Sequence, residues 1–210
     1  MSRQKSLSEK VLGFNWEDHL PHRIDEHEQI ELSSFDQAME FHRENYARVF
    51  TLEGQEMPFL EDPFTEFKQK YYREVGDFMV FRRDSKVIGV YTGTLIDWST
   101  YYHRNLYFLS EFQSQGRGTK IQDFVHQILR NFGVVKTEAD ISPSNLAQVK
   151  MLNRAEYNIA GVNYSERWGV LVRFCKFLNP RNEKAFLDRF CYGVKPQLRS
   201  SENPPFEKGG

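Results

Sequence analysis

The sequence predicts an α/β (α+β) fold, a mixed and mostly antiparallel sheet of about six to seven strands flanked by helices. Two observations lead to this prediction. Apolar residues follow a period of two between Asp77 and Trp98, as in paired strands, and helical spacing in segments on either side. No segment repeats another, so one sheet with helices on its faces accommodates every element.

The N-terminal half of this sheet domain is expected to contain a strand, two helices and a hairpin. Ser33 or Ser34 would cap the first helix, and Pro63 suits the first turn of the second because a first turn leaves its N–H groups unpaired. A turn at 83–85 separates the two hairpin strands. The expected elements are a strand at 29–32, helices at 35–49 and 63–72, and hairpin strands at 78–81 and 87–91.

The C-terminal half alternates strands with helices. One strand runs directly into a glycine-rich loop, and Gly133 suits the end of the helix that follows this loop. The expected elements are strands at 106–109, 134–141 and 167–178, helices at 119–131 and from Asn145 to about 156, and a short helix near 185–190.

Length and composition favour one ordinary domain. A chain of 210 residues buries roughly 70 % of its unfolded surface and needs no disulfide framework. The 28 basic and 29 acidic residues nearly balance, which argues against a nucleic-acid partner. No apolar run approaches the ~20 residues of a membrane span. Cys175 and Cys191 are too few for a disulfide scaffold, so we expect a reducing, cytoplasmic location.

The ends of the chain differ from its middle. Residues 1–28 are polar, with three histidines among acidic residues at spacings that fit no metal site, so we expect a solvated arm and no metal. Residues 29–178 form the sheet domain. Residues 179–210 form a C-terminal extension whose polar end is expected to be flexible.

The clearest chemistry lies in the loop between the strand at 106–109 and the next helix. A helix N-terminus presents unpaired N–H groups and a partial positive charge, and Gly116 and Gly118 let a phosphate approach the backbone. The loop therefore suits a pyrophosphate. A P-loop fits poorly because Thr119 follows Gly118, and a dinucleotide-binding loop fits poorly because Ile121 replaces its third glycine.

Residues 109–121 match the pattern Gln/Arg-x-x-Gly-x-Gly/Ala, with Gln113, Gly116 and Gly118 in register. This segment resembles the acyl-CoA signature of the GNAT N-acyltransferase superfamily.

A second segment supports the resemblance. Residues 141–145, the helix after them and residues 156–161 are similar to the fifth strand of the family, its asparagine and the helix before its sixth strand. The resemblance covers roughly residues 29–178. It implies a GNAT-like sheet in which two central parallel strands splay apart.

The resemblance implies acetyl-CoA or another acyl-CoA as co-substrate and no metal. Main-chain N–H groups of the loop would hold the pyrophosphate, and an amide at Leu109 would polarise the acyl carbonyl. Asn145 would bond the pantetheine arm, cap its own helix, or do both. Arg117 would reach a CoA phosphate or lie in solvent. The residues predicted to bind the co-substrate are Leu109, Glu111, Gln113, Gln115, Gly116, Arg117, Gly118, Thr119 and Asn145.

One position departs from the family pattern. The family frequently has a tyrosine seven residues after the asparagine, where it protonates the departing thiolate, but this chain has Leu152. Tyr157 or Tyr164 would then donate the proton, unless water assists the thiolate or catalysis has been lost. We predict Tyr157 as the acid.

The attacking ammonium needs a base, which calls for a carboxylate or a histidine near the acyl carbon. Glu111, His103 and Glu138 lie nearest by position, with Asp140 on the same strand face as Glu138. We predict Glu111 as the base.

Aromatic residues mark the expected acceptor region. The chain has 18 phenylalanines, and a cleft lined by aromatic rings would take an apolar or cationic amine, or an acyl chain longer than acetyl. We expect residues 98–103 to form a loop in this region. The aromatic positions are Phe59, Phe64, Phe67, Tyr71, Tyr72, Trp98, Tyr101, Tyr102 and His103.

These features predict an acyl-CoA-dependent N-acyltransferase, first of all an acetyltransferase, acting by direct attack of an amine in a ternary complex. Its acceptor would be a small-molecule amine or a protein amine, and a homodimer is left open. The alternatives are a long-chain N-acyltransferase that uses acyl-CoA or acyl carrier protein, and a non-catalytic CoA-binding or interaction module.

Overall fold

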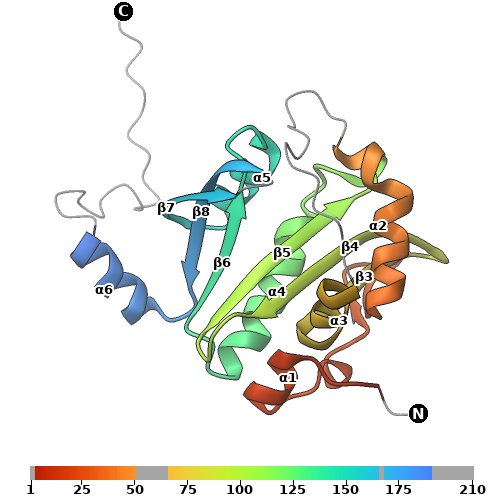
Figure 1. Cartoon of the computed structure of the whole chain (residues 1–210), viewed down its shortest axis with the longest axis horizontal. Helices are drawn as coiled ribbons and strands as arrows, with labels where there is room; N and C mark the ends of the chain where they lie inside the picture. The colour runs from red at the N-terminus through yellow and green to blue at the C-terminus, as the bar shows by residue number, and fades with distance from the viewer. Residues whose placement is uncertain (1–2, 51–65, 166–167, 191–210) are drawn as a thin grey trace, which may run out of the picture.

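The computed structural model describes residues 3–50, 66–165 and 168–190. Six α-helices and eight strands alternate along this part of the chain (Figure 1). The helices are α1 (Leu7–Leu12), α2 (Phe35–Phe50), α3 (Glu66–Val75), α4 (Arg117–Asn131), α5 (Leu146–Arg154) and α6 (Pro180–Phe190). The strands are β1 (His22–Arg23), β2 (Glu28–Leu32), β3 (Gly76–Arg83), β4 (Lys86–Leu95), β5 (Thr100–Phe108), β6 (Lys136–Ile141), β7 (Asn158–Ser165) and β8 (Gly169–Phe177).

The strands form one sheet in the order β1-β2-β3-β4-β5-β6-β8-β7. Only β5 and β6 pair in parallel, and the other neighbours are antiparallel. The predicted fold class is therefore confirmed, with eight strands where about six to seven were expected.

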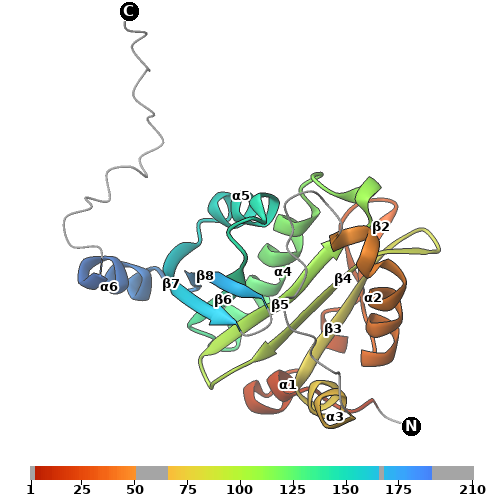
Figure 2. The ribbon, with the colours of Figure 1, turned by 45° about the horizontal axis from the view of Figure 1, so that its top comes forward.

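Helices cover both faces of the sheet (Figure 1). On one face, α2 packs its Phe35 and Phe41 against Phe78, Val90 and Tyr107 of the strands. On the other face, the apolar stripe of α4 packs against β3, β4 and β5 in the largest core cluster. A third cluster joins α5 to β6 and β8 on the same face as α4. Figure 2 shows α5 beside one end of α4.

Residues before β2 belong to the core and not to a solvated arm, so that expectation is wrong. Phe14 and Trp16 lie in the largest core cluster. The buried carboxylate of Asp77 accepts hydrogen bonds from Ser8 Oγ (2.6 Å), Trp16 Nε1 (2.7 Å) and Tyr101 OH (2.8 Å). These bonds satisfy a group that burial would otherwise penalise, and they fix the N-terminal segment to the start of β3.

Three elements differ from the sequence predictions. β5 begins at Thr100, so residues expected to form a loop are strand residues, and Tyr101 is fully buried in the core. β7 was not predicted from periodicity because its side chains are exposed on both faces, and period two then carries no signal. α6 begins at Pro180, five residues earlier than expected.

Other predictions are confirmed or fall outside the described residues. The strand at 29–32, the first helix, the hairpin and the helix after the glycine-rich loop are all present. The expected start of the second helix at Pro63, the aromatic residues Phe59 and Phe64, and the C-terminal end from 191 lie outside the described residues. Within the described residues, no helix is long and apolar enough to cross a membrane.

Candidate functional site

The sheet opens between its two parallel strands (Figure 1). β5 and β6 pair only where residues 100–102 meet residues 136–138. Beyond this point no further pairs join them. Arg104 is an extra residue in β5 relative to β4, because Thr92 pairs with Asn105 whereas Gly93 pairs with His103. A bulge of this kind bends its strand and turns its main-chain groups.

The N-terminus of α4 borders this opening and has an uncapped first turn. Gly116 occupies the N-cap position with φ of 79°, which a residue with a Cβ adopts only under strain. Among the described residues no side chain accepts a hydrogen bond at this cap, and the first turn carries no acidic residue. The first N–H groups of the helix, from Arg117 to Thr119, are therefore available to an anion.

Glutamine side chains hold the loop before α4 in shape. Gln113 Nε2 donates to the Phe108 carbonyl (2.9 Å), and Gln115 Nε2 donates to the Glu111 carbonyl (3.0 Å). The conformation of the loop is thus set by its own residues. The predicted roles of Gln113, Gln115 and Thr119 in binding a pyrophosphate stay predictions.

Arg117 lies inside the protein, so the alternative that it lies in solvent is wrong. It is 7 % exposed and forms an ion pair with Glu28 of β2, with its Nε 2.6 Å from Glu28 Oε2. Its Nη1 also donates to the Phe112 carbonyl (3.0 Å) and to Gln115 Oε1 (2.7 Å). The side chain therefore fixes the loop from within, and a contact with a phosphate stays a prediction.

α5 forms the opposite wall of the opening. Asn145 caps this helix, because its Oδ1 accepts a hydrogen bond from the Gln148 N–H (3.2 Å). Gln148 Nε2 donates across the opening to the Leu106 carbonyl of β5 (2.9 Å). Met151 reaches Gly118, where a Cβ would collide with its sulfur. The capping role of Asn145 is confirmed, and its role toward pantetheine stays a prediction.

The segment after β5 does not provide the predicted oxyanion donor. The Leu109 N–H donates to the Ile88 carbonyl (2.9 Å), so it continues the sheet, and its predicted bond to an acyl carbonyl is wrong. Glu111 is exposed, with its carboxylate 3.4 Å from Lys86 Nζ. Both residues line a pocket of about 370 Å³ against α2, together with Phe41, Glu44, Asn45, Lys86, Val87 and Ser110.

Tyr157 lies at the inner end of the opening. Its hydroxyl is 2.8 Å from His126 Nε2 and 3.1 Å from Thr137 Oγ1. Burial raises the pKa of this phenol, which keeps it protonated at neutral pH. Tyr164, the other tyrosine considered, is 79 % exposed on β7. Leu152, which replaces the family tyrosine, is buried against Tyr157 in the core below α5.

The sequence analysis missed His126 and Gln122 as candidate residues. Both lie on the same side of α4 as Gly118, one and two turns further along. Gln122 Oε1 is buried without a hydrogen-bond partner among the described residues. The sequence signal that could have identified them is a pair of polar residues four positions apart on an otherwise apolar helix face.

His103 joins the same cluster from β5 and does not face solvent as a base would. Its Nδ1 is 2.7 Å from Tyr91 OH, and its Nε2 is 3.2 Å from His126 Nε2. Burial lowers the pKa of His103 to about 3 and also lowers that of His126, so both imidazoles are neutral.

The carboxylates Glu138 and Asp140 lie on the other face of the sheet. Glu138 forms ion pairs with Lys136 and Arg173, and Asp140 accepts two hydrogen bonds of 2.8 Å from Arg173. Bonding to Arg173 lowers the pKa of Asp140 despite partial burial. The lowered pKa leaves Asp140 poorly suited to take a proton, and Glu138 is occupied by its two ion pairs.

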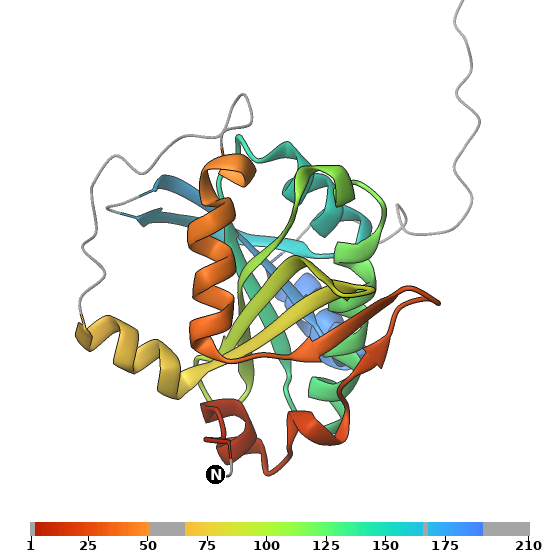
Figure 3. The ribbon, with the colours of Figure 1, turned by 90° about the vertical axis from the view of Figure 1, so that its right-hand side faces the viewer.

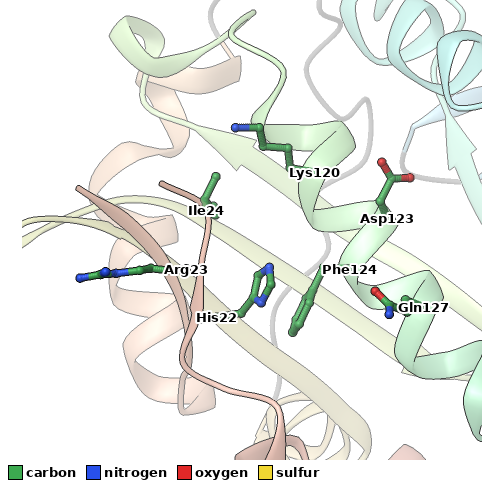
Figure 4. Close-up of a pocket in the computed structure, with 7 residues that line it drawn as sticks. All are labelled: His22, Arg23, Ile24, Lys120, Asp123, Phe124 and Gln127. Atoms are coloured by element: carbon green, nitrogen blue, oxygen red, sulfur yellow. The ribbon is translucent and has the colours of Figure 1, made fainter. Parts of the chain in front are cut away.

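A second pocket lies on the far side of α4 (Figure 4). It has a volume of about 300 Å³, and the ring of His22 stacks on Phe124 at 4.1 Å. Its α4 residues, from Lys120 to Gln127, belong to a different face of the helix from Gly118, Gln122 and His126. This pocket is therefore separate from the opening between β5 and β6.

Comparison with known proteins identifies the family. Residues 35–157 match the model of the acetyltransferase (GNAT) family. The chain belongs to the GNAT family. The matched region runs from α2 to Tyr157, so it includes the loop before α4, the opening and α5. The resemblance inferred from the sequence is confirmed. A search of curated proteins finds no match.

Solved GNAT structures share the fold of this chain at low sequence identity. An IAA acetyltransferase from Bacillus cereus has 16 % identity and a TM-score of 0.54, with 71 % of this chain and 99 % of that chain covered. A GNAT acetyltransferase from Elizabethkingia anophelis, with acetyl-CoA bound, has 16 % identity and a TM-score of 0.54 over 73 % and 99 %. The ribosomal-protein-S5-alanine acetyltransferase from Vibrio fischeri has 16 % identity and a TM-score of 0.55 over 75 % and 97 %.

Proposed function

We propose that this GNAT protein is an acyl-CoA-dependent N-acyltransferase, and specifically an acetyltransferase. The observation that carries the proposal is the uncapped first turn of α4 beside the opening between β5 and β6. In contrast, side chains cap the N-termini of α5 (Asn145) and α1 (Ser6). The α4 end is suited to a pyrophosphate instead.

We place the rest of an acyl-CoA where β5 and β6 no longer pair. Main-chain N–H groups from Gln115 to Thr119 would hold the pyrophosphate, and the pantetheine arm would run along the part of β5 that does not pair with β6. From Gly118 to His126 the helix rises about 12 Å, so the thioester would lie near the inner end of the opening. Gln122 Oε1, which has no partner among the described residues, would accept a hydrogen bond from a pantetheine amide.

The chemistry proceeds by direct attack of an amine in a ternary complex. The amine nitrogen attacks the thioester carbon, the C–S bond breaks, and an amide and the CoA thiolate result. Tyr157 would give its proton to the thiolate, and His126 at 2.8 Å would stabilise the phenolate that remains. Glu111, the predicted base, lies beside the glycine-rich loop and next to the pocket against α2, at the opposite end of β5 from Tyr157, so its role as base stays a prediction.

The acceptor is an amine of a small molecule or of a protein. Neighbours in fold include acetyltransferases of ribosomal proteins, so a peptide N-terminus belongs in any substrate panel. The phenylalanine excess is a weak argument for a long acyl chain, because Phe14, Phe35, Phe41, Phe78, Phe81, Phe108 and Phe174 are core residues.

Thiol release tests the proposal. Acetyl-CoA is incubated with the protein and a panel of small amines and N-terminal peptides, and free CoA thiol is measured. Calorimetry with acetyl-CoA and decanoyl-CoA measures binding and the preferred chain length. Absence of CoA binding would refute the proposal. Tight binding without turnover on any amine would favour the non-catalytic module, and preference for decanoyl-CoA would favour the long-chain enzyme.

Tyr157→Phe tests the assigned acid. We expect kcat to fall by roughly 100-fold, as for loss of a general acid, with the KM for acetyl-CoA nearly unchanged. Tyr164→Phe is the matched control because it removes a hydroxyl that is exposed on β7. Equal kinetics of the two variants would show that Tyr157 has no role in proton transfer.

A further inference from the structure

β7 forms one edge of the sheet (Figures 1 and 3). Its apolar side chains are exposed. Ile159, Val162 and Tyr164 are 65 %, 60 % and 79 % exposed, and Val170 of the neighbouring β8 is 45 % exposed. Single exposed apolar residues are ordinary, but four on two adjacent strands form a patch, which typically marks a contact surface.

A bulge places these side chains on one face. Ile159 pairs with Phe174, Val162 with Val172 and Tyr164 with Val170, and the register shifts between Ile159 and Gly161. Residues 170, 172 and 174 alternate with the opposite face of β8, so their partners on β7 share a face as well. Phe174 lies in the core below α5, and α5 thus covers only the inner part of an apolar face that continues outward over β7.

No strand of the described residues pairs with the outer edge of β7, and this edge lacks the features that usually block strand pairing. Proteins protect edge strands with charged residues or proline, or by keeping them very short. The eight residues Asn158–Ser165 contain no charged residue and no proline. The Tyr164 N–H donates to Asn163 Oδ1 of its own strand (3.0 Å), so a side chain holds this main-chain donor where a neighbouring strand would supply a carbonyl.

We infer that β7 pairs with β7 of a second copy of this chain, antiparallel and about a two-fold axis at Asn163. Val162 then lies opposite Tyr164 of the second copy, and Tyr164 lies opposite Val162 of the second copy. The main-chain N–H and C=O groups of Val162 and of Tyr164 point to the outer edge of β7. Each Val162–Tyr164 pair across the two copies therefore exchanges two hydrogen bonds. The two apolar faces join into one.

A second copy fits this edge better than an unrelated chain does. A two-fold contact requires a surface that complements itself, and an uncharged strand brings no like charges together when it meets its own copy. Its apolar residues meet apolar residues, and Gly161 meets Ser165 on the other face. An edge of eight residues with four large side chains is smaller than a standard interface of about 800 Å² per partner, so the dimer is expected to form in the micromolar range.

Sedimentation velocity of the full chain over a concentration series tests the inference, and it needs no assumption about acyl transfer. The wild-type chain should shift from monomer to dimer, and Tyr164→Lys should raise the dissociation constant at least 10-fold. Trp98→Lys is the matched control because Trp98 is 76 % exposed away from β7. A wild-type chain that stays monomeric, or a dimer that both variants weaken equally, would overturn the inference.

Disulfide trapping tests the register. Residues opposite each other in a non-hydrogen-bonded antiparallel pair have Cα atoms about 4.5 Å apart, within the range of a disulfide. Asn163→Cys should therefore cross-link two copies under mild oxidation, above the background of the wild-type Cys175 and Cys191. Ser165→Cys should not exceed that background because it lies opposite Gly161 of the second copy. Cross-linking of the Ser165 variant alone would show that the stated pairing is wrong.

Discussion

Arg117 shows how a single residue of the signature loop can serve the loop without touching the ligand. It follows Gly116 directly, where the sequence suggests a phosphate contact. The structure instead places its guanidinium in a buried ion pair with Glu28, while Nη1 holds the Phe112 carbonyl. Arginine suits this place because its planar group donates several hydrogen bonds in fixed directions. The anion site therefore depends on main-chain groups whose positions a buried side chain sets.

Replacing Arg117 should destabilise the fold and weaken CoA binding together. Arg117→Met leaves Glu28 buried with only Arg83 beside it at 3.3 Å, and breaking a buried pair costs about 3 kcal/mol or more. Arg73→Met is the control, since the Arg73–Asp36 pair is exposed and worth about 0.5 kcal/mol. Urea unfolding measures the loss of stability in each variant, and calorimetry with acetyl-CoA measures the loss of CoA binding. Equal losses in the two variants would contradict the structural role.

The residues of the site differ in how far the sequence could predict them. Gly116 and Gly118 were predictable because the loop requires their backbone freedom and lack of Cβ. The partners of Arg117 and of the Leu109 N–H were not, because both are contacts between segments distant in sequence, such as Glu28 and Ile88. The cluster of His103, His126 and Tyr157 likewise forms only when α4 packs on the sheet.

At the level of elements, the site depends on how closely α4 and α5 approach. A Cβ at Gly118 would meet the sulfur of Met151 on α5, so this side chain would have to shift, whereas no atom of the described residues lies within 4 Å of a Cβ at Gly116. The two glycines are thus required for different reasons. Gly116 needs the left-handed conformation, and Gly118 needs space next to α5.

A double-mutant cycle separates these two reasons. Gly118→Ala should lower stability and CoA affinity through the collision with Met151, and Met151→Ala should relieve part of this loss, with a coupling energy of about 1 kcal/mol. Gly116→Ala should lower stability by about 1–2 kcal/mol through backbone strain that Met151→Ala leaves unchanged. Chemical denaturation gives the stability, and calorimetry the CoA affinity, of the wild-type chain, the three single variants and the two double variants that combine Met151→Ala with each glycine variant. A coupling energy near zero at Gly118 would refute the steric reason.

Two strands were mispredicted because the alternation of apolar and polar residues, which usually marks a strand, is missing from them. β5 begins six residues before its predicted start, because Tyr101 and His103 point into a polar network and their types suggested a loop. β7 is exposed on both faces, so alternation could not mark it. In contrast, the strands β3 and β4 of the hairpin are apolar and buried on both faces, and α4 buries one apolar face, and the sequence predicted these elements well.

At the scale of the whole molecule, buried polar groups connect the N-terminal segment to the inner end of the site. Ser8, Trp16 and Tyr101 surround Asp77, and the next residue but one on β5 is His103, which contacts His126. The sequence could not reveal that part of the segment 3–28 contributes to the core, since its composition is polar and Phe14 and Trp16 are the only large buried apolar residues described there.

The two buried histidines should make stability depend on acid pH. Burial lowers the pKa of His103 to about 3 from 6.5, and that of His126 is lowered too, with His103, Lys176 and Arg130 adding repulsion. Between about pH 3 and pH 6.5, His103 binds more protons in the unfolded chain than in the folded chain, and the lowered pKa of His126 acts in the same direction. Stability is therefore full above about pH 6.5 and falls as pH decreases, by about 1.4 kcal/mol per pH unit for each histidine.

His126→Asn should remove one histidine from this dependence. Urea unfolding between pH 7 and 4.5 should give a curve whose slope is smaller than that of the wild-type chain by about 1.4 kcal/mol per pH unit, because asparagine takes up no proton. His27→Asn is the matched control at the surface, since the His27 side chain is mostly exposed near Asp84. Asp140 and Glu9, whose pKa values are lowered by bonding to Arg173 and to Arg3, add the same acid slope to every variant. The difference between the His126 and His27 variants therefore isolates the histidine pair, and identical slopes would mean that His126 takes up its proton without unfolding the chain.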